Sequence, residues 1–344
     1  MSTIIEETPF LGLQVQDRLP SDENVFPVAW YAVAWSRELG TTPVKRRLLG
    51  EDIVLYRDKG GRVHALTAYC SHRGADLTLG RCTAQGLTCA YHGWTFDGTG
   101  ECVRIPAHPE RAIPEFARMT AYATQERANL IWVYPEAISK NVTPPPLSLF
   151  PELEDDRFAL SPYEQRWQAH LTRVVESVLD VAHLAFVHKR TIGKRVSEAV
   201  TQMAFTVPDR DSIDIENGGG RLLYRFPQQW LLRPSQASSA EFINYVTFTP
   251  IDRQETMIYG YAGRTFARRI PGLSQIFSRY SRRILNEDKM IVESQHPRPI
   301  PEALRMEAHV PADAPQVRFR QRWFEFLSSP NEPKVMIKDG GSRP

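Results

Sequence analysis

The crowding of its cysteines constrains this chain more than any other feature of its sequence. The 344 residues include four cysteines, which all fall within a span of 33 residues: Cys70, Cys82, Cys89 and Cys102. The other 311 residues contain none, so this is not a secreted protein stabilised by many disulfide bonds. A chain of this length can bury a large hydrophobic core and does not need disulfide bonds for stability. Thiols gathered in one short stretch of an otherwise cysteine-free chain favour a local metal site.

Two of these cysteines are each followed closely by a histidine and a glycine. Residues 70–74 read CSHRG, and residues 89–93 read CAYHG. Such a set can hold one zinc ion, or a [2Fe–2S] centre with two Cys on one iron and two His on the other. Zinc sites commonly pair like ligands within a loop, whereas each loop here pairs unlike ones. The pattern therefore favours the iron–sulfur centre over zinc, with these candidate ligands: Cys70, His72, Cys89 and His92.

On these loops, C-x-H and C-x₂-H, the chain resembles the Rieske family over at least residues 26–136, including the opening FPVAWY at 26–31. Rieske proteins of respiratory complexes carry two further cysteines, joined as a disulfide, where Ala75 and Tyr91 stand here. They also carry a serine at the position of Trp94, and its hydroxyl raises the potential. The resemblance therefore implies the lower-potential oxygenase or ferredoxin branch. Cys82 and Cys102 are then expected to be small buried side chains.

The chain divides into two regions of different pattern. Short strand-like runs separated by turn signals extend from Phe26 to about Glu136, and the run TPPP at 143–146 favours a stiff connector. Beyond it, the sequence predicts a helix over 164–188, strands over 200–264 and a helix over 273–295. We therefore expect an α+β protein with three parts: a disordered N-terminal tail (1–25), an all-β domain (26–143) and an α+β domain with an antiparallel sheet (144–344).

A second constellation lies on the first of these predicted helices, where residues 180–188 read DVAHLAFVH. Asp180 and His183 share a helix face, but His188 lies about 140° round from His183 on an ideal helix. Both histidines can reach one metal only if the helix bends or ends between them. Two histidines and a carboxylate form the facial triad of non-haem Fe(II) oxygenases. The alternative is a polar stripe on an ordinary amphipathic helix.

The third ligand of such a triad is sought among Glu287, Asp288 and Glu293 in the C-terminal helix. Asp288 continues the apolar stripe of that helix and is expected on its buried face, where an unpaired carboxylate is costly. A metal removes that cost, and a buried ion pair with Arg283 is the alternative. The stripe consists of Leu273, Phe277, Tyr280, Ile284 and Ile291.

Together, the two constellations resemble the α (oxygenase) subunit of a Rieske non-haem iron oxygenase over residues 26–330. The resemblance implies a helix-grip-like catalytic domain, with mononuclear iron on His183, His188 and Asp288. It implies that Asp180 is the bridging acid, relaying electrons to the iron from the cluster ligand His92 of a neighbouring subunit in a head-to-tail homotrimer. Ser177 stands where the family motif has Asn.

The resemblance also implies an activity. The segments IPAHP at 105–109 and QER at 125–127 resemble the monooxygenase and demethylase branch, which implies O₂-dependent hydroxylation of a small to medium ring-containing metabolite. The alternatives are oxidative O- or N-demethylation, cis-dihydroxylation of an arene, an electron-transfer protein without oxygenase activity, and a zinc-structural interaction protein. The candidate pocket residues, for which core packing is the competing interpretation, are Phe186, Phe205 and Trp230.

The chain contains no G-x-G-x-x-G fingerprint in a strand–helix context and no second cysteine set of ferredoxin type. NAD(P)H is therefore expected to act only indirectly, through a separate reductase with or without a ferredoxin. The charge balance of 42 Lys+Arg against 40 Asp+Glu argues against nucleic-acid and polybasic membrane partners. The N-terminal segment lacks the features of a signal peptide, and a cytoplasmic protein is expected.

Overall fold

The computed structural model describes residues 24–138, 143–200, 204–217, 219–236, 238–300 and 307–337. The expected N-terminal tail lies outside these residues except for Asn24 and Val25. The chain forms two compact units. The small unit comprises Val28–Leu149 and Lys334–Pro344, and the large unit comprises Met1–Pro27 and Phe150–Pro333. The division after Leu149 lies a few residues beyond the expected domain boundary at 143/144.

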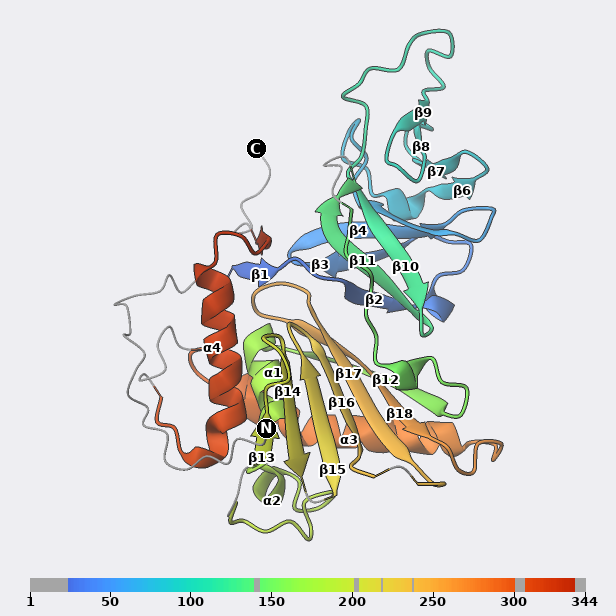
Figure 1. Ribbon diagram of the computed structural model, residues 1–344. Helices are drawn as coiled ribbons and strands as arrows, with labels where there is room; N and C mark the ends of the chain where they lie inside the picture. Colours follow the sequence, from blue (N-terminus) through green and yellow to red (C-terminus); the bar gives the residue numbers. More distant parts are fainter. Residues whose placement is uncertain are drawn as a thin grey trace. The chain divides into compact units, whose positions relative to one another are not determined.

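The small unit is built from two antiparallel sheets, and no α-helix occurs among its described residues. The larger sheet has the order β2-β11-β10-β5-β4-β3, and the smaller has the order β6-β7-β8-β9 (Figure 1). The β-rich pattern expected for this region is confirmed. The strands are β2 (Tyr31–Trp35), β3 (Val44–Leu48), β4 (Glu51–Arg57), β5 (Val63–Thr67), β6 (Arg81–Thr83), β7 (Gly86–Thr88), β8 (Thr95–Phe96), β9 (Cys102–Arg104), β10 (Ala121–Arg127) and β11 (Leu130–Ala137).

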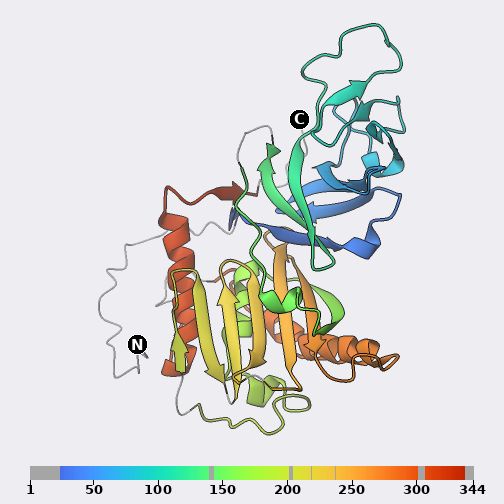
Figure 2. The ribbon, with the colours of Figure 1, turned by 45° about the vertical axis from the view of Figure 1, so that its right-hand side comes forward.

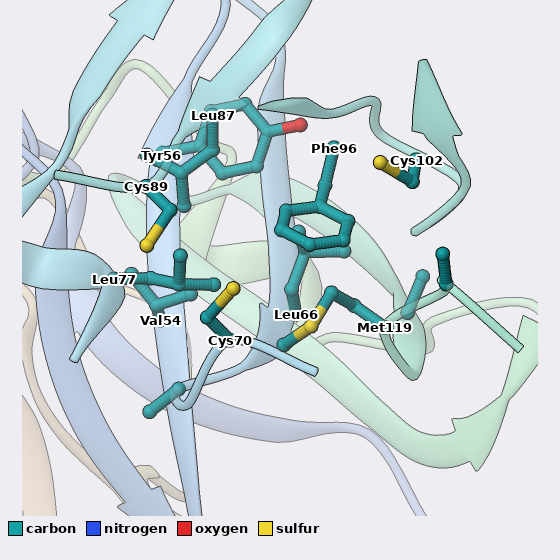
Figure 3. Packing of buried hydrophobic residues seen from close by; sticks show 13 residues of the cluster. Val54, Tyr56, Leu66, Cys70, Leu77, Leu87, Cys89, Phe96, Cys102 and Met119 are labelled. Carbon is teal, nitrogen blue, oxygen red and sulfur yellow. The ribbon is translucent and has the colours of Figure 1, made fainter. Parts of the chain in front are cut away.

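A buried apolar cluster joins the strands of the small unit to the cysteine loops (Figure 3). Leu66, Leu77, Leu87 and Phe96 are completely buried in it. The cluster also includes Cys70 and Cys89, each only 3% exposed. The two cysteine loops therefore rest on a packed core, which holds their backbones in place.

The large unit is a seven-stranded antiparallel sheet with helices on one face (Figures 1 and 2). Its strand order is β12-β18-β17-β16-β15-β14-β13. Helix α3 packs along β12 and β18, α1 on β17, and α4 on β14. The elements are β12 (Ala159–Trp167), α1 (Leu171–Leu179), α2 (Leu184–Val187), β13 (Ala204–Thr206), β14 (Ser212–Asn217), β15 (Gly220–Arg225), β16 (Gln229–Pro234), β17 (Phe242–Pro250), β18 (Thr256–Arg264), α3 (Leu273–Ser294) and α4 (Ala314–Ser328), and the short strands β1 (Val25–Pro27) and β19 (Lys334–Met336) lie near the chain ends.

The helix expected over 273–295 is confirmed, but the helix expected over 164–188 is wrong in two places. Its first residues belong to β12, because that strand pairs with β18 over nine consecutive residues and its ladder satisfies their backbone groups. The helix that follows begins at Leu171 and already ends at Leu179. No helix among the residues described here is long and apolar enough to cross a membrane.

Helix α1 is fixed by a buried ionic network to the C-terminal part of the large unit. Arg173 donates to Glu307 at 2.8 Å, and Arg320 of α4 donates to the same carboxylate at 2.6 Å. Glu176 of α1 forms an ion pair with both arginines. Because paired charges in such a network satisfy one another away from water, the network holds α1 against α4 and the segment that carries Glu307.

Candidate metal centres

The two cysteine loops of the small unit have the same backbone hydrogen bonds. In the first loop, Cys70 N–H donates to Ala75 O at 2.9 Å and Gly74 N–H donates back to Cys70 O at 2.8 Å. In the second, Cys89 N–H donates to Trp94 O at 2.8 Å and Gly93 N–H donates back to Cys89 O at 3.1 Å. In each loop, the backbone of the cysteine is thus hydrogen-bonded to the residues four and five positions later, which closes the loop into a tight turn.

The glycine after each histidine is required by the backbone. Gly74 has φ +68° and Gly93 has φ +72°, in the left-handed region that favours glycine. A Cβ on Gly93 would also lie only 2.9 Å from the ring of Pro106. The glycines that the sequence places in both loops therefore have a physical role in shaping them.

The four candidate cluster ligands meet at the end of these loops. The buried thiols of Cys70 and Cys89 interact with each other, and burial raises the pKa of Cys70 to about 11. The rings of His72 and His92 lie with centroids 4.6 Å apart, and His92 is exposed. His72 Nδ1 is a buried atom with no hydrogen-bond partner among the described residues. This orphaned nitrogen and the two adjacent thiols fit a [2Fe–2S] cluster, which would give each of them an iron to bind.

A single zinc ion fits this arrangement less well. A tetrahedral ion requires its four donor atoms to converge on one point. Among the described residues, the one group of three or more His, Cys, Asp or Glu whose ligand atoms come within 4.8 Å of one another lies elsewhere, in the large unit. The loop ligands instead form two like pairs, the interacting thiols of Cys70 and Cys89 and the adjacent rings of His72 and His92, as a two-iron centre requires.

Aromatic side chains contact both histidines of the loops. The indole ring of Trp94 stacks on the imidazole of His72, with centroids 4.4 Å apart and an angle of 2° between the planes. Tyr91 packs against His92 with centroids 3.8 Å apart. The other two cysteines pack in or against the buried cluster: Cys102 belongs to it and lies beyond Phe96 in Figure 3, and Cys82 packs against it partly buried.

The second constellation lies on the turn that follows α1. Asp180 ends α1 with an extended backbone, φ −79° and ψ 127°, and its Oδ1 accepts the backbone N–H of Ala182 at 2.8 Å. This local hydrogen bond starts a new turn, so the chain re-enters a helix at α2 with His183 before it and His188 after it. Asp180 and His183 are therefore not on one helix as expected. The chain breaks from α1 before His183, and the two histidines then flank the short helix α2, which ends before His188.

The structure brings the two histidines to a carboxylate of α3. His188 Nε2 lies 2.9 Å and His183 Nε2 lies 3.4 Å from the same oxygen, Asp288 Oδ1. The three ligand atoms are within 4.8 Å of one another, and all three side chains are less than a fifth exposed. Two imidazole nitrogens and one carboxylate oxygen in this arrangement fit the facial triad of a mononuclear iron.

The charges of this group are mutually dependent. Burial lowers the pKa of His183, but the carboxylates of Asp180 and Asp288 outweigh it and raise that pKa to about 9. Burial raises the pKa of Asp288, but contact with the two histidines outweighs it and lowers that pKa. Perturbed titratable groups gathered in this way are typical of functional sites.

The other two acidic residues considered as third ligand lie elsewhere on α3. Glu287 Oε2 accepts from His188 Nδ1 at 2.9 Å, on the opposite side of that ring from Asp288. Glu293 accepts the backbone N–H of Gln168 at 2.7 Å. Arg283 has its ion-pair contact with Glu287 at 3.9 Å, so among the described contacts it does not neutralise Asp288. Glu287 thus faces His188 and does not join the group of three ligand atoms.

The remaining residues singled out by sequence show different environments. The hydroxyl of Ser177 donates to Val174 O at 2.8 Å within α1. Phe186 is 58% exposed, Phe205 is partly buried on β13, and Trp230 is buried with an indole N–H that has no acceptor among the described residues. Of the three candidate pocket residues, Trp230 thus combines burial with an unused donor.

Comparisons with known proteins agree with both centres. Residues 29–122 match the family described as the Rieske [2Fe-2S] domain, and residues 167–217 and 221–327 match the vanillate O-demethylase oxygenase C-terminal domain. The iron-sulfur subunit TsaM1 of the toluene-4-sulfonate monooxygenase system of Comamonas testosteroni is 34% identical over 165 residues, covering 48% of this chain and 47% of TsaM1. The methylxanthine N3-demethylase NdmB of Pseudomonas putida is 27% identical over 335 residues, covering 90% of this chain and 92% of NdmB.

A solved structure gives the same relationship. NdmB of Pseudomonas putida CBB5 superposes with a TM-score of 0.75 at 25% identity, covering 87% of this chain and 90% of NdmB. The chain nevertheless spans only about a third to a half of several curated relatives with which it shares higher identity: 47%, 37% and 32% of their lengths.

The order of the two matched families along the chain agrees with the order of the two centres. The Rieske match contains both cysteine loops, and the oxygenase match contains the two histidines and Asp288. The fold accordingly has an all-β Rieske domain and a catalytic domain with an antiparallel sheet and helices, and the cofactors are a [2Fe–2S] cluster and a mononuclear iron. The chain belongs to the Rieske non-haem iron oxygenases, as their α (oxygenase) subunit.

Proposed function

We propose that this chain hydroxylates a small to medium ring-containing molecule with O₂ at an iron held by His183, His188 and Asp288. The observation that carries the proposal is the convergence of these three ligand atoms within 4.8 Å, in a chain that also has two Rieske loops. When bound, the iron supplies coordination positions for O₂ and the [2Fe–2S] cluster, on Cys70, His72, Cys89 and His92, supplies electrons one at a time.

The side chains around the iron would leave room for these reactants. Among the described residues, no fourth His, Cys, Asp or Glu joins the group of three. The remaining coordination positions of an iron ion are therefore left to molecules from outside. The histidines and Asp288 act in this proposal as ligands, and Asp288 carries the negative charge that offsets the metal. Trp230 is proposed to contribute its unused N–H to the surrounding pocket.

Asp180 is proposed to connect the two centres across neighbouring copies. Its Oδ2 lies 3.8 Å from His183 Nδ1, and its side chain is about a third exposed. The exposed edge of Asp180 would face His92 of a neighbouring copy in a head-to-tail homotrimer. Support comes from exposed apolar side chains that an assembly would cover: Tyr91 beside the cluster loops is 66% exposed, and Phe186 on α2 is 58% exposed.

The proposed system has further components. The sequence shows no dinucleotide fingerprint and no second cysteine set, so electrons from NAD(P)H are proposed to arrive through a separate reductase or ferredoxin. TsaM1, to which the chain is similar, is by its description a subunit of a monooxygenase system. The substrates named for TsaM1 and NdmB, toluene-4-sulfonate and a methylxanthine, both contain rings.

Oxidative demethylation is the second candidate activity. It is favoured by the match of the catalytic region to a vanillate O-demethylase domain and by the similarity to an N3-demethylase over 90% of the chain. Hydroxylation of a methyl group attached to O or N releases that carbon as formaldehyde. Both reactions therefore use the same site, and the position of the substrate carbon decides between them. The cis-dihydroxylation of an arene is the remaining alternative on this scaffold.

Metal analysis and turnover test the proposal. We expect about three irons per chain and a Rieske absorption spectrum. With a surrogate reductase and a panel of ring compounds, we expect O₂ uptake coupled to a hydroxylated or demethylated product. His183→Ala should retain about two irons and the spectrum, yet form no product. A wild type with only two irons that is unaffected by this substitution would instead be an electron carrier, and a colourless zinc protein would contradict both interpretations.

A further inference from the structure

The imidazole of His188 is held at both nitrogens by consecutive residues of α3. Its Nε2 lies 2.9 Å from Asp288 Oδ1, and its Nδ1 lies 2.9 Å from Glu287 Oε2. The ring is only 2% exposed, so water does not compete with either contact. An imidazole can offer only one nitrogen to a metal while the other keeps a proton, and these two contacts distinguish the nitrogens.

Glu287 is itself fixed by two further contacts. The hydroxyl of Thr191 donates to Glu287 Oε2 at 2.5 Å, and Arg283 lies 3.9 Å from Oε1. Thr191 belongs to the turn after His188, where its backbone N–H donates to His188 O at 2.8 Å. The carboxylate therefore joins α3 to both the side chain and the backbone turn of His188.

We propose that Glu287 is a positioning residue that selects Nε2 of His188 as the iron ligand. This inference rests on the proposed function. Glu287 accepts a hydrogen bond from the protonated Nδ1 of His188, so the lone pair of His188 Nε2 is directed at the metal beside Asp288. A carboxylate on the far nitrogen also makes the imidazole a stronger donor to a metal. Glu287 thus acts through His188 and does not bind the iron.

In the described part of the chain, His183 has no carboxylate hydrogen-bonded to its Nδ1, so the role proposed for Glu287 applies to His188 alone. His183 Nδ1 is 3.8 Å from Asp180 Oδ2, too long for a hydrogen bond. That nitrogen has no hydrogen-bond partner among the described residues. His188 is therefore the histidine whose orientation is fixed before the metal arrives, and Glu287 is the residue that fixes it.

Metal affinity tests this role without turnover. The mononuclear iron is removed by a chelator from the holoprotein, the Rieske spectrum is checked, and Co²⁺ binding is titrated by its visible absorption. Loss of a hydrogen-bonded carboxylate behind a ligating histidine typically weakens metal binding about 10–100-fold, so we expect that loss in Glu287→Ala. Glu287→Gln should recover most of it, because the amide oxygen can accept the same proton. Glu293→Gln is the matched control on the same helix and should bind as wild type.

Two results would overturn the inference. One is Co²⁺ affinity in Glu287→Ala within threefold of wild type, and the other is Glu287→Gln binding no tighter than Glu287→Ala. His183→Ala separates this failure from failure of the proposed function. If His183→Ala loses Co²⁺ while Glu287→Ala does not, the iron site stands and only the role of Glu287 is refuted. If His183→Ala also binds as wild type, the proposed iron site is itself wrong.

Discussion

Replacing Gly193 with alanine would place one methyl group against the backbone of α2, the short helix between the two candidate histidine ligands. A Cβ at this position would lie 1.8 Å from Leu184 O, 2.8 Å from Leu184 C and 3.0 Å from His188 C. All three neighbours are backbone atoms, so no side-chain rotation can relieve the contacts. Gly193 N–H also donates to His188 O at 2.9 Å, which ties residue 193 to the same turn.

The displacement that follows can be sized from these distances. Real Cβ atoms essentially never come closer than 3.0 Å to another heavy atom, so Gly193 and α2 would have to separate by more than an ångström. Such overpacking costs about 1–3 kcal/mol of stability. Metal–ligand distances tolerate only about 0.2 Å, and a misplacement of about 1 Å can lower activity about 100-fold. We therefore expect Gly193→Ala to lose mononuclear iron and turnover.

The Rieske spectrum serves as an internal standard for this experiment, because the cluster loops belong to the other unit. The variant should keep about two cluster irons per chain with an unchanged spectrum, and it should lose the third iron and product formation. Gly40→Ala is the control, since nothing lies within 4 Å of a Cβ there. Full iron content and turnover in Gly193→Ala would refute the argument that α2 positions the ligands.

Three other substitutions test separate features. Asp180→Asn keeps an oxygen for the backbone turn but loses the charge, so both metals should stay bound while turnover falls roughly 10–100-fold. Burial raises the pKa of Glu307, but its contacts with Arg173 and Arg320 outweigh burial and lower this pKa to about 2. The ionised Glu307 therefore stabilises the fold above pH 4.5, and this stabilisation is lost as the pH falls towards 2. In Glu307→Gln, the free energy of unfolding measured in urea should depend less on pH between 4.5 and 2. Trp94→Leu removes stacking on His72 worth about 0.5–1.5 kcal/mol, so the cluster should bleach up to about tenfold faster.

Each of these has a result that would count against it. Full turnover in Asp180→Asn would show that its charge does not connect the centres. For Glu307, a variant whose stability falls as steeply as wild type between pH 4.5 and pH 3 would show that other carboxylates cause the loss. Tyr91→Phe is the control, because it keeps an aromatic ring beside His92. If the cluster of Trp94→Leu bleaches no faster than that of Tyr91→Phe, the stacking of Trp94 on His72 does not protect the cluster.

The cluster loops could be predicted from sequence because their information is local. Ligands, glycines and backbone hydrogen bonds all lie within two segments of six residues, 70–75 and 89–94. The iron site depends on contacts across the chain: Glu287 meets a histidine 99 residues earlier, and no spacing rule links the two. Sequence could place Glu287 on a helix beside Asp288, but only the packing of α3 shows that the side chain faces inward.

The buried face of α3 lies one residue away from the apolar stripe that the sequence predicts. The predicted apolar stripe of α3 includes Tyr280 and Ile291, which are 44% and 52% exposed. The buried positions are Ser281, Leu285 and Val292, one residue further along. Asp288 still falls between Leu285 and Val292 at helical spacing, so the shift left the assignment unchanged. Apolar residues on the outer side of a helix have the same periodicity as those inside, and sequence alone does not distinguish them.

Ile337 gives the small unit an unusual order of assembly. This residue, near the end of the chain, is buried and packs so closely on Gly50 that a Cβ there would lie 2.8 Å from it. During synthesis the ribosome releases Ile337 only after the entire large unit has been made, so the small unit completes its core last although Val28–Leu149 are made before most of the large unit. A fragment cut at the linker would contain both cysteine loops but would lack the side chain that covers Gly50.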